Sequence, residues 1–462
     1  MISFQHYGII SILVQPVNRN DIKGDFMDDL LTVREIAEKV AENGGRVYLV
    51  GGCVRDEILG KENKDIDIEI HGISVNDVEN ILDTVGKRLE YGKSFGVYGL
   101  SGCTLDISLP RKNDGIDPFL GTESAARRRD FTINALMKDA LTGEVSDYFG
   151  GLDDLKNGII RHVDDETFPE DSLRVFRAAQ FASRLGFSIA PETEKICRSI
   201  DVSSLPAERV MTEIEKALLK SEKPSVFFEL LRGMDQLDVW FPEVKALIGV
   251  PQNQEYHKEG DAWTHTMMVM DEAAKRRSKA VYPLGFMMSA LCHDLGKAVC
   301  TTEDQNGVVH SYLHETEGLP VVREFLRRLT SESRLKKYVM NMVEYHMEPN
   351  AMAHVRSKLK KTNKLFDSSV EPFDLIQLSI CDGLGKIPSY NDTEEFLIER
   401  YNRFTDIMSR PYVMGSDLID NGLVPDEGFS DILAYAHKLR LAGIEKEDAL
   451  KQTLAFARKI KK

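Results

Sequence analysis

Acidic side chains alternate with isoleucines in the stretch from Lys64 to Ile70, KDIDIEI. Side chains on a β-strand point to the two faces in turn, so Asp65 and Asp67 share one face and the isoleucines face a core. Neighbouring carboxylates repel each other, and a cation would relieve that repulsion. Mg²⁺ suits such oxygen ligands, because it takes one or two carboxylates and completes its shell with water and substrate phosphates. The alternative is an edge strand with a solvated acidic face.

A glycine pair precedes the acidic strand and points to phosphate binding. The run 47–50, VYLV, predicts a buried strand that leads directly into Gly51 and Gly52, and residues 54–59 predict a short helix. Glycine has no Cβ, so the backbone N–H groups of such a strand-to-helix turn can approach phosphate oxygens closely. Arg55 adds a positive charge next to this turn.

A later strand offers a third carboxylate. Residues 104–109 alternate polar and apolar side chains around Asp106, as a half-buried strand does. In the same sheet, Asp106 would join Asp65 and Asp67.

The elements that must position these side chains change in type along the chain. An amphipathic helix over 27–43 opens a section of mixed strands and helices, and the strand patterns vanish from about residue 150. We therefore predict an α+β fold, with an N-terminal mixed sheet and helices followed by helical parts only.

Length and composition exclude several classes of protein. A chain of 462 residues is too long for one core, and roughly 150 residues per domain predicts about three. The net charge of −15 argues against coating nucleic acid by bulk electrostatics, although a local basic groove is compatible with it. Six scattered cysteines without a C-x-x-C pair favour the reduced cytoplasm over a disulfide framework. No apolar run approaches the ~20 residues of a membrane span, so we expect no membrane partner.

Five ordered motifs resemble those of the class II tRNA nucleotidyltransferases. They are LVGGCVRD at 49–56, DID at 65–67, RRRDFTINAL at 127–136, EDSLR at 170–174 and PAERV at 206–210. A single such motif would be weak evidence, whereas five in this order and spacing are specific. The family includes CCA-adding enzymes, their A-adding and CC-adding relatives and bacterial poly(A) polymerases. The resemblance implies a polymerase-β-like head, Mg²⁺ as cofactor, tRNA as partner and ATP and CTP as substrates.

The resemblance also implies roles for residues of the head. Asp65 and Asp67 would hold two Mg²⁺ ions that polarise a terminal 3′-OH and neutralise the leaving pyrophosphate, and Asp106 would complete the catalytic group as a third carboxylate. The triphosphate would be bound by Gly51, Gly52 and Arg55, and the region of the ribose by Arg129, Asp130 and Asn134.

A helix expected over 170–185 would carry the nucleotide template. Asp171 offers an acceptor and Arg174 a fork of donors, which match C or A but leave G and U mismatched. Arg177 falls on the same helix face as Arg174. The alternative is a surface salt bridge between Asp171 and Arg174 worth under about 1 kcal/mol.

The segment between Arg111 and Arg127 bears on which nucleotide is added. It is shorter than in family members that add all of CCA, in which a flexible loop at this place helps to switch the pocket from C to A. A-adding specialists lack that loop. Both CCA addition and A-only addition therefore stay open.

A second set of metal-ligand side chains resembles the HD metal-dependent phosphohydrolase pattern. The set consists of His265, the pair His293 and Asp294, and Asp382, with His314 and His346 as further candidates. Imidazoles combined with carboxylates suit Mn²⁺ or Ni²⁺ better than Mg²⁺ alone. The resemblance implies hydrolysis of phosphoesters at damaged or cyclic RNA 3′ ends. Whether one metal or two is bound stays open.

The two resemblances divide the chain into five parts. These are an extension with little structure (1–26), a nucleotidyltransferase head (27–150), a helical neck and body with the template and RNA binding (151–250), an HD domain (251–390) and a helical tail (391–462). We expect an enzyme that adds CCA, or the terminal A, to tRNA 3′ ends without a nucleic-acid template and also acts as a phosphohydrolase. The alternatives are an A-adding specialist or poly(A) polymerase, and an HD nucleotide phosphohydrolase whose head binds nucleotides without polymerising.

Overall fold

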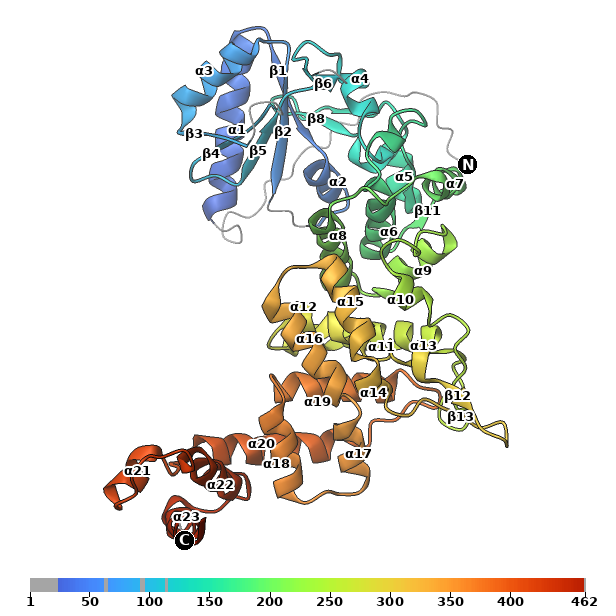
Figure 1. The fold of residues 1–462 in the computed structure, drawn as a ribbon. Helices are drawn as coiled ribbons and strands as arrows, with labels where there is room; N and C mark the ends of the chain where they lie inside the picture. The colour runs from blue at the N-terminus through green and yellow to red at the C-terminus, as the bar shows by residue number, and fades with distance from the viewer. Residues whose placement is uncertain (1–23, 62–64, 92–95, 113–114, 461–462) are drawn as a thin grey trace. The chain divides into compact units, whose positions relative to one another are not determined.

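The computed structural model describes residues 24–61, 65–91, 96–112 and 115–460 (Figure 1). The chain forms two compact units, Met1–Val202 and Ser203–Lys462, called here the first and the second unit. The extension predicted over 1–26 lies outside the described residues, except for its last three positions, which begin the first helix. The section predicted over 151–250 is shared between the two units, and the five-part division stays a prediction.

A mixed sheet forms the centre of the first unit. Its strands lie in the order β3-β4-β5-β2-β1-β8-β9, with β2 parallel to β5 and the other neighbours antiparallel. The bounds are β1 Arg46–Val50, β2 Ile66–His71, β3 Arg88–Glu90, β4 Val97–Leu100, β5 Leu105–Ser108, β8 Met137–Asp139 and β9 Val145–Ser146. The α+β prediction and the two acidic strands are thereby confirmed.

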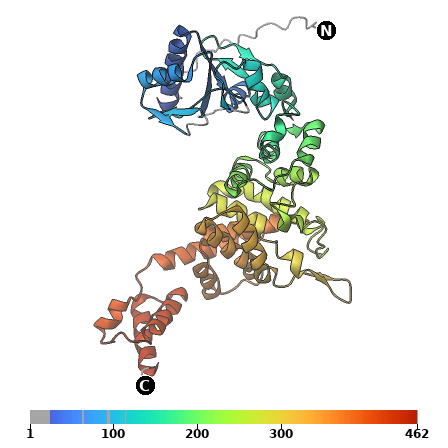
Figure 2. The same cartoon turned by 45° about the horizontal axis from the view of Figure 1, so that its top comes forward.

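One face of this sheet carries the core, which explains the alternation in β2. Ile66, Ile68 and Ile70 are at most 2% exposed and pack with buried side chains of α1 (Gly24–Glu42) and α3 (Val75–Val85). Both views show these two helices on the same side of the sheet (Figures 1 and 2). The acidic side chains of β2 therefore lie on the opposite face.

Short helices and strands complete the first unit. The helices are α2 Gly52–Ile58, α4 Thr122–Arg127, α5 Gly151–Asn157, α6 Arg174–Leu185 and α7 Pro191–Ser199, with 3₁₀ turns η1 Thr132–Asn134 and η2 Phe168–Glu170. Two-residue strands pair as β6 Arg111–Lys112 with β7 Gly115–Ile116, and as β10 Ile159–Ile160 with β11 Ser188–Ile189.

Two expectations about these elements need correction. The helix predicted over 170–185 begins only at Arg174, because Asp171 has an extended backbone (φ −126°, ψ 99°) after η2. Strands do not vanish after residue 150 either, since the pairs β10–β11 and, in the second unit, β12–β13 follow it. Strands of two residues carry no readable alternation, which is why their sequences gave no signal.

The second unit is built around α12, a helix whose residues 285–292 are all buried. Helices α8, α11, α16 and α19 contact it, and an apolar helix enclosed in this way needs no polar face. The helices are α8 Ala207–Lys220, α9 Ser225–Gly233, α10 Pro242–Lys245, α11 Ala262–Arg276, α12 Pro283–Cys292, α13 Lys297–Cys300, α14 His314–Glu317, α15 Leu319–Leu329, α16 Ser333–Tyr345, α17 Glu348–His354, α18 Leu359–Ser368, α19 Pro372–Leu384, α20 Glu394–Ser409, α21 Gly415–Asp420, α22 Phe429–Leu441 and α23 Lys446–Ile460, with a 3₁₀ turn η3 Arg277–Lys279 and a hairpin of β12 Thr302–Glu303 and β13 Val309–His310.

The last three helices of this unit, α21 to α23, have a small apolar core of their own. Across the described ranges, no helix combines the length and the apolar character that crossing a membrane requires.

Candidate active sites

Three carboxylates come together at the centre of the sheet. Asp67 and Asp106 are direct register partners in the parallel pair of β2 and β5, and Asp65 immediately precedes β2. Burial raises the pKa of Asp67; Arg129 opposes this rise, and the charges of Asp106 and Asp65 add to it. The donor set is therefore oxygen-rich, and its negative charge is only partly balanced at Asp67, which fits Mg²⁺.

The glycine turn lies directly beside these carboxylates. Gly51 has a φ of +69°, in the left-handed region that favours glycine. A Cβ at Gly51 would lie 3.4 Å from Asp67 Oδ2 and 3.5 Å from Arg129 Nη1. Gly52 follows as the first residue of α2. The turn therefore brings backbone, carboxylate and guanidinium together where the sequence predicted phosphate binding.

A buried polar chain connects two of the predicted nucleotide-binding motifs with Arg177 of α6. Arg55 is 2% exposed, and its Nη1 donates to Asn134 Oδ1 at 2.6 Å. Asn134 Nδ2 donates to Asp130 Oδ1 at 3.0 Å, and Arg177 Nε donates to Asp130 Oδ2 at 2.7 Å. Although burial raises the pKa of Asp130, Arg177 and Asn134 lower it below its usual range. An ionised Asp130 thus joins η1 to α2 and α6.

This geometry changes the interpretation of Arg55. The sequence suggested direct contact with a triphosphate, but the Arg55 guanidinium donates to Asn134 and pairs with Asp56 inside the protein. In this position Arg55 holds α2 against η1.

The predicted template residues lie at the start of α6, and their polar groups bond to the backbone. Arg174 Nη1 donates to Thr167 O at 2.7 Å and Nη2 to Arg128 O at 2.5 Å. Asp171 Oδ1 accepts from Leu173 N at 3.2 Å. A base would have to take over these donors, so the template role of Asp171 and Arg174 stays a prediction.

Sequence reasoning missed two side chains of the first site. Glu69 Oε2 lies 3.0 Å from Arg129 Nη2, and Glu69 Oε1 lies 2.9 Å from His71 Nε2. Although burial raises the pKa of Glu69, Arg129 and His71 lower it. The signal was present in the alternation, which places Glu69 and His71 on the face of Asp67.

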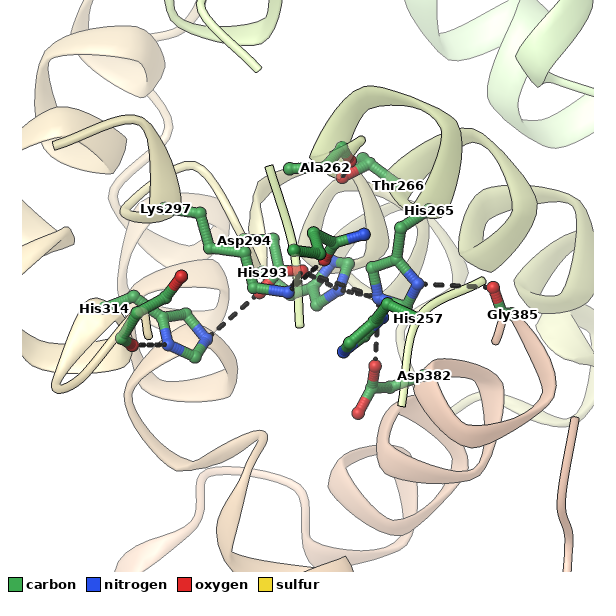
Figure 3. Close-up of polar contacts among 12 residues, drawn as sticks. His257, Ala262, His265, Thr266, His293, Asp294, Lys297, His314, Asp382 and Gly385 are labelled. Atoms are coloured by element: carbon green, nitrogen blue, oxygen red, sulfur yellow. Dashed lines mark hydrogen bonds and ion pairs between the residues drawn. The ribbon is translucent and has the colours of Figure 1, made fainter. Parts of the chain in front are cut away.

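The predicted HD residues converge inside the second unit, from α11, α19 and the end of α12 (Figure 3). His265 Nε2 lies 3.0 Å from Asp382 Oδ1, 3.5 Å from Asp294 Oδ2 and 3.4 Å from His293 Nε2. All four residues are at most 4% exposed. Neighbouring ligands of an ion bound at about 2.1 Å lie roughly 3.0–3.4 Å apart, so these donor spacings fit a metal.

Asp294 is shared by two groups of donors. Its Oδ2 lies 3.3 Å from His293 Nε2, whereas its Oδ1 lies 3.0 Å from His314 Nε2 and 3.8 Å from His346 Nε2. In each group the donor atoms lie within 4.8 Å of one another. A carboxylate with one oxygen in each group can bridge two ions, and the mixture of imidazole and carboxylate favours a transition metal over Mg²⁺ alone.

The protonation states of several of these groups suit metal binding. Against the effect of burial, however, hydrogen bonds to Asp382 and Asp294 raise the pKa of His265 and His314, so a metal would have to displace their protons. Burial raises the pKa of Asp294, but His293 and Lys297 lower it well below the usual range, and Lys386 and His265 do the same for Asp382. Burial and the charge of His314 lower the pKa of His346 to about 3. Ionised carboxylates and a neutral imidazole are the forms that bind metal.

The polar connector before α11 contributes two residues that the sequence analysis did not select. The buried Glu259 carboxylate has its Oε1 2.6 Å from His257 Nδ1 and 3.1 Å from His265 Nδ1. Despite the opposing effect of burial, hydrogen bonds from His265 and His257 lower the pKa of Glu259 to about 2. Glu259 thereby orients His265 so that Nε2 faces the other donors. A histidine two positions before a glutamate, just ahead of His265, was the available signal.

Two buried lysines also border the HD residues. Lys297 Nζ lies 2.6 Å from Asp294 Oδ2, and Lys386 Nζ lies 3.0 Å from Asp382 Oδ2. Each balances the charge of a carboxylate. Lys297 follows the HD pair in HDLGK, whereas Lys386 lies two residues after the end of α19 and had no motif to mark it.

Family models identify the class of the protein. Residues 47–161 match the poly A polymerase head domain, and residues 186–248 match the probable RNA and SrmB-binding site of polymerase A. With the acidic strands in one mixed sheet, these matches define a nucleotidyltransferase with a poly A polymerase head. The resemblance to class II tRNA nucleotidyltransferases is confirmed.

Curated relatives narrow the assignment. The multifunctional CCA protein of Actinobacillus pleuropneumoniae serotype 5b (strain L20) is 36% identical over 340 residues, which cover 69% of this chain and 80% of the relative. That of Pasteurella multocida (strain Pm70) is 36% identical over 341 residues, covering 69% and 79%. The chain belongs to the family of the multifunctional CCA proteins.

Solved structures agree on the fold. A CCA-adding enzyme in complex with ATP has a TM-score of 0.66 at 20% identity and covers 95% of both chains. The Thermotoga maritima CCA-adding enzyme complexed with tRNA has a TM-score of 0.63 at 21% identity, covering 94% of this chain and 98% of that one.

Proposed function

We propose that the protein transfers nucleotides from CTP and ATP to tRNA 3′ ends and so completes their CCA sequence. The observation that carries the proposal is the grouping of Asp65, Asp67 and Asp106 beside the Gly51 turn and Arg129. The relatives' name, multifunctional CCA protein, favours CCA addition over A-only addition. The free cysteines among the described residues fit the reducing cytoplasm, where we place the enzyme.

The residues of the first site have different roles in nucleotidyl transfer. The three carboxylates would hold Mg²⁺, which supplies charge at the attacking 3′-OH and the leaving pyrophosphate. Gly51 leaves room for the triphosphate, and the Nη1 edge of Arg129 donates to it. The Asp130 chain keeps η1 and α6 in register with that turn. Positioning and charge account for most of the catalysis in such a reaction.

An extension assay tests the activity and its nucleotide choice together. Purified protein with Mg²⁺ receives tRNAs that end before CCA, after C or after CC, with CTP, ATP or both. We expect full CCA on the first substrate when both nucleotides are present, and no extension by Asp65→Ala. Addition restricted to A on the tRNA ending in CC would support the A-adding alternative. Extension of no tRNA, together with release of phosphate from nucleotides, would support the hydrolase alternative.

We further propose that the second unit hydrolyses phosphoesters at RNA 3′ ends, with two Mn²⁺ or Ni²⁺ ions sharing Asp294. The separate donor groups on its two carboxylate oxygens favour this second activity. Such a metal supplies an activated water for attack on phosphorus. Lys297 and Lys386, displaced from their carboxylates, would then face the substrate phosphate.

Metal content and hydrolysis test this second site. We expect about two metal ions per chain after loading with Mn²⁺. We also expect hydrolytic opening of a 2′,3′-cyclic phosphate at the end of an RNA oligonucleotide, in which water adds to phosphorus and one P–O bond to the ribose breaks, leaving a phosphomonoester. Asp294→Asn removes the shared ligand, so it should lose both ions and the hydrolysis while still adding nucleotides. His346→Ala should keep one ion. A wild type that binds one ion would contradict the two-metal arrangement.

A further inference from the structure

We propose that Glu69, supported by His71, is a positioning residue that fixes the guanidinium of Arg129 at the nucleotide site. The inference rests on the proposed nucleotide addition, whose site Arg129 lines. Glu69 lies on β2, one alternation beyond Asp67 and on the same face. It is 7% exposed, so its carboxylate is removed from water and needs partners inside the protein.

Both oxygens of Glu69 have such a partner. Oε2 lies 3.0 Å from Arg129 Nη2, and Oε1 lies 2.9 Å from His71 Nε2. The His71 ring is held in turn, because its Nδ1 lies 3.1 Å from the backbone oxygen of Leu120. A carboxylate held at both oxygens has little freedom to rotate. The Nη2 edge of the guanidinium is therefore fixed from the side of the sheet.

With Nη2 held by Glu69, the position of the opposite Nη1 edge of Arg129 is fixed as well. Arg129 Nη1 and Asp67 Oδ2 both lie near the Gly51 turn, 3.5 Å and 3.4 Å from the position of a Cβ there. An unrestrained guanidinium would have the Asp67 carboxylate as an alternative partner. That ion pair would occupy an oxygen that Mg²⁺ needs and turn the donors of Arg129 away from the triphosphate. Because Glu69 already pairs with Arg129, it prevents both the ion pair with Asp67 and the reorientation of the Arg129 donors.

The end of β2 also contacts the segment that is expected to influence nucleotide choice. Besides the contact of His71 with Leu120, Gly72 N donates to Pro118 O at 2.8 Å. The end of β2 is thereby tied to residues 118–120, which lie in the short stretch between Arg111 and Arg127. A disturbance of His71 should reach Arg129 only through Glu69, so we expect a smaller effect from it.

A double-mutant cycle tests whether Glu69 acts through Arg129. Glu69→Ala, Arg129→Ala and the double variant are assayed with tRNA ending in CC and varied ATP, and with tRNA lacking CCA and varied CTP. We expect Glu69→Ala to raise the KM for both nucleotides roughly tenfold, as misplacement of a binding group does. The double variant should be no worse than Arg129→Ala, because the two residues form one unit. The half-saturating Mg²⁺ concentration should also rise in Glu69→Ala.

A control and a binding measurement separate positioning from stability. Asp154 is 6% exposed, pairs with Arg161 at 3.1 Å and accepts from Thr132 Oγ1 at 2.7 Å. Asp154→Asn removes another buried charge of the first unit, and the Asn side chain can still accept from Thr132. It should lower the melting temperature and leave KM unchanged. Glu69→Gln keeps the side-chain volume and repeats the cycle if Glu69→Ala does not fold. Calorimetric binding of ATP to the metal-free protein should weaken in the Glu69 variants and not in Asp154→Asn.

Two results would overturn the inference. One is additive losses in the double variant, and the other is an unchanged KM and ATP affinity in Glu69→Gln and Glu69→Ala. A wild type that adds no nucleotide would overturn the proposed function instead, and ATP binding to the variants would still decide the role of Glu69.

Discussion

The protein surroundings of Asp67 disfavour its negative charge. Burial raises the pKa of its carboxyl group, and Asp106 and Asp65 raise it further against the opposing effect of Arg129. A raised pKa means that the folded state holds the proton more tightly than the unfolded state. The carboxylate therefore destabilises the fold increasingly as the pH rises through that raised pKa. A bound cation would remove this effect.

Asp67→Asn should therefore stabilise the first unit while abolishing nucleotide addition. In EDTA at neutral pH we expect its melting temperature to rise by about 2–4 °C, the shift that follows from roughly 1 kcal/mol in a unit of this size. The difference should disappear at a pH below the usual Asp range, where the wild-type carboxyl is protonated too. Scanning calorimetry at both pH values measures it. A less stable variant at neutral pH would contradict the electrostatic argument.

Adding Mg²⁺ and ATP provides a second comparison. Both should raise the melting temperature of the wild type by mass action and leave that of Asp67→Asn nearly unchanged. An equal rise in the two proteins would mean that the ligands bind elsewhere.

At the scale of elements, the turn between β1 and α2 depends on Gly51. Gly51→Ala places a Cβ at a φ of +69° and near Asp67 and Arg129. We expect a loss of about 1–2 kcal/mol in stability and a several-fold rise in the KM for ATP. Gly60→Ala is the matched control, because Gly60 has a φ of +65° and no atom within 4 Å of its Cβ position. It should show the same loss of stability with an unchanged KM.

The second site depends on a close approach of two helical segments. A Cβ on Gly296 would lie 2.1 Å from the backbone oxygen of His314, so Gly296→Ala must push that segment away. We expect the Mn²⁺ content to fall by about half, and the hydrolysis of cyclic phosphate with it, while nucleotide addition persists. Gly233→Ala, at a position with no atom within 4 Å, is the control. Full metal content in Gly296→Ala would show that His314 is not a ligand.

At the scale of the whole molecule, the two sites belong to different compact units and have different donor sets. Asp67 lies in the first unit among carboxylates, and Asp294 lies in the second among imidazoles. Hard oxygen ligands and mixed nitrogen–oxygen ligands select different ions. We therefore expect one chain to bind two kinds of metal.

Selective reloading should separate the two activities. After treatment with EDTA and dialysis, Mg²⁺ alone should restore nucleotide addition and leave most of the hydrolysis of cyclic phosphate absent. Mn²⁺ or Ni²⁺ at stoichiometric amounts should restore that hydrolysis. Recovery of both activities with Mg²⁺ alone would show that the second site does not need a transition metal.

Local patterns in the sequence were sufficient to predict the acidic strand and the glycine turn, whereas the HD residues were predicted from a resemblance that starts at the adjacent pair His293 and Asp294. The alternation in β2, the need for glycine at a left-handed turn and an adjacent His-Asp pair all arise within a few residues. Such short-range constraints are written directly in the order of the side chains. The α+β fold followed from the same periodicities.

The tertiary structure decided the contacts that join residues far apart in the chain. Glu259 and Lys386 contact the residues of the second site. Glu69 pairs with Arg129, and the buried Arg55 donates to Asn134. None of these follows from spacing, because which buried charge meets which partner depends on how whole elements pack and on the cost of leaving a charge unpaired. The sequence alone determined which chemical groups lie on each face of a strand or helix. The packing of these elements determined which of the groups contact one another.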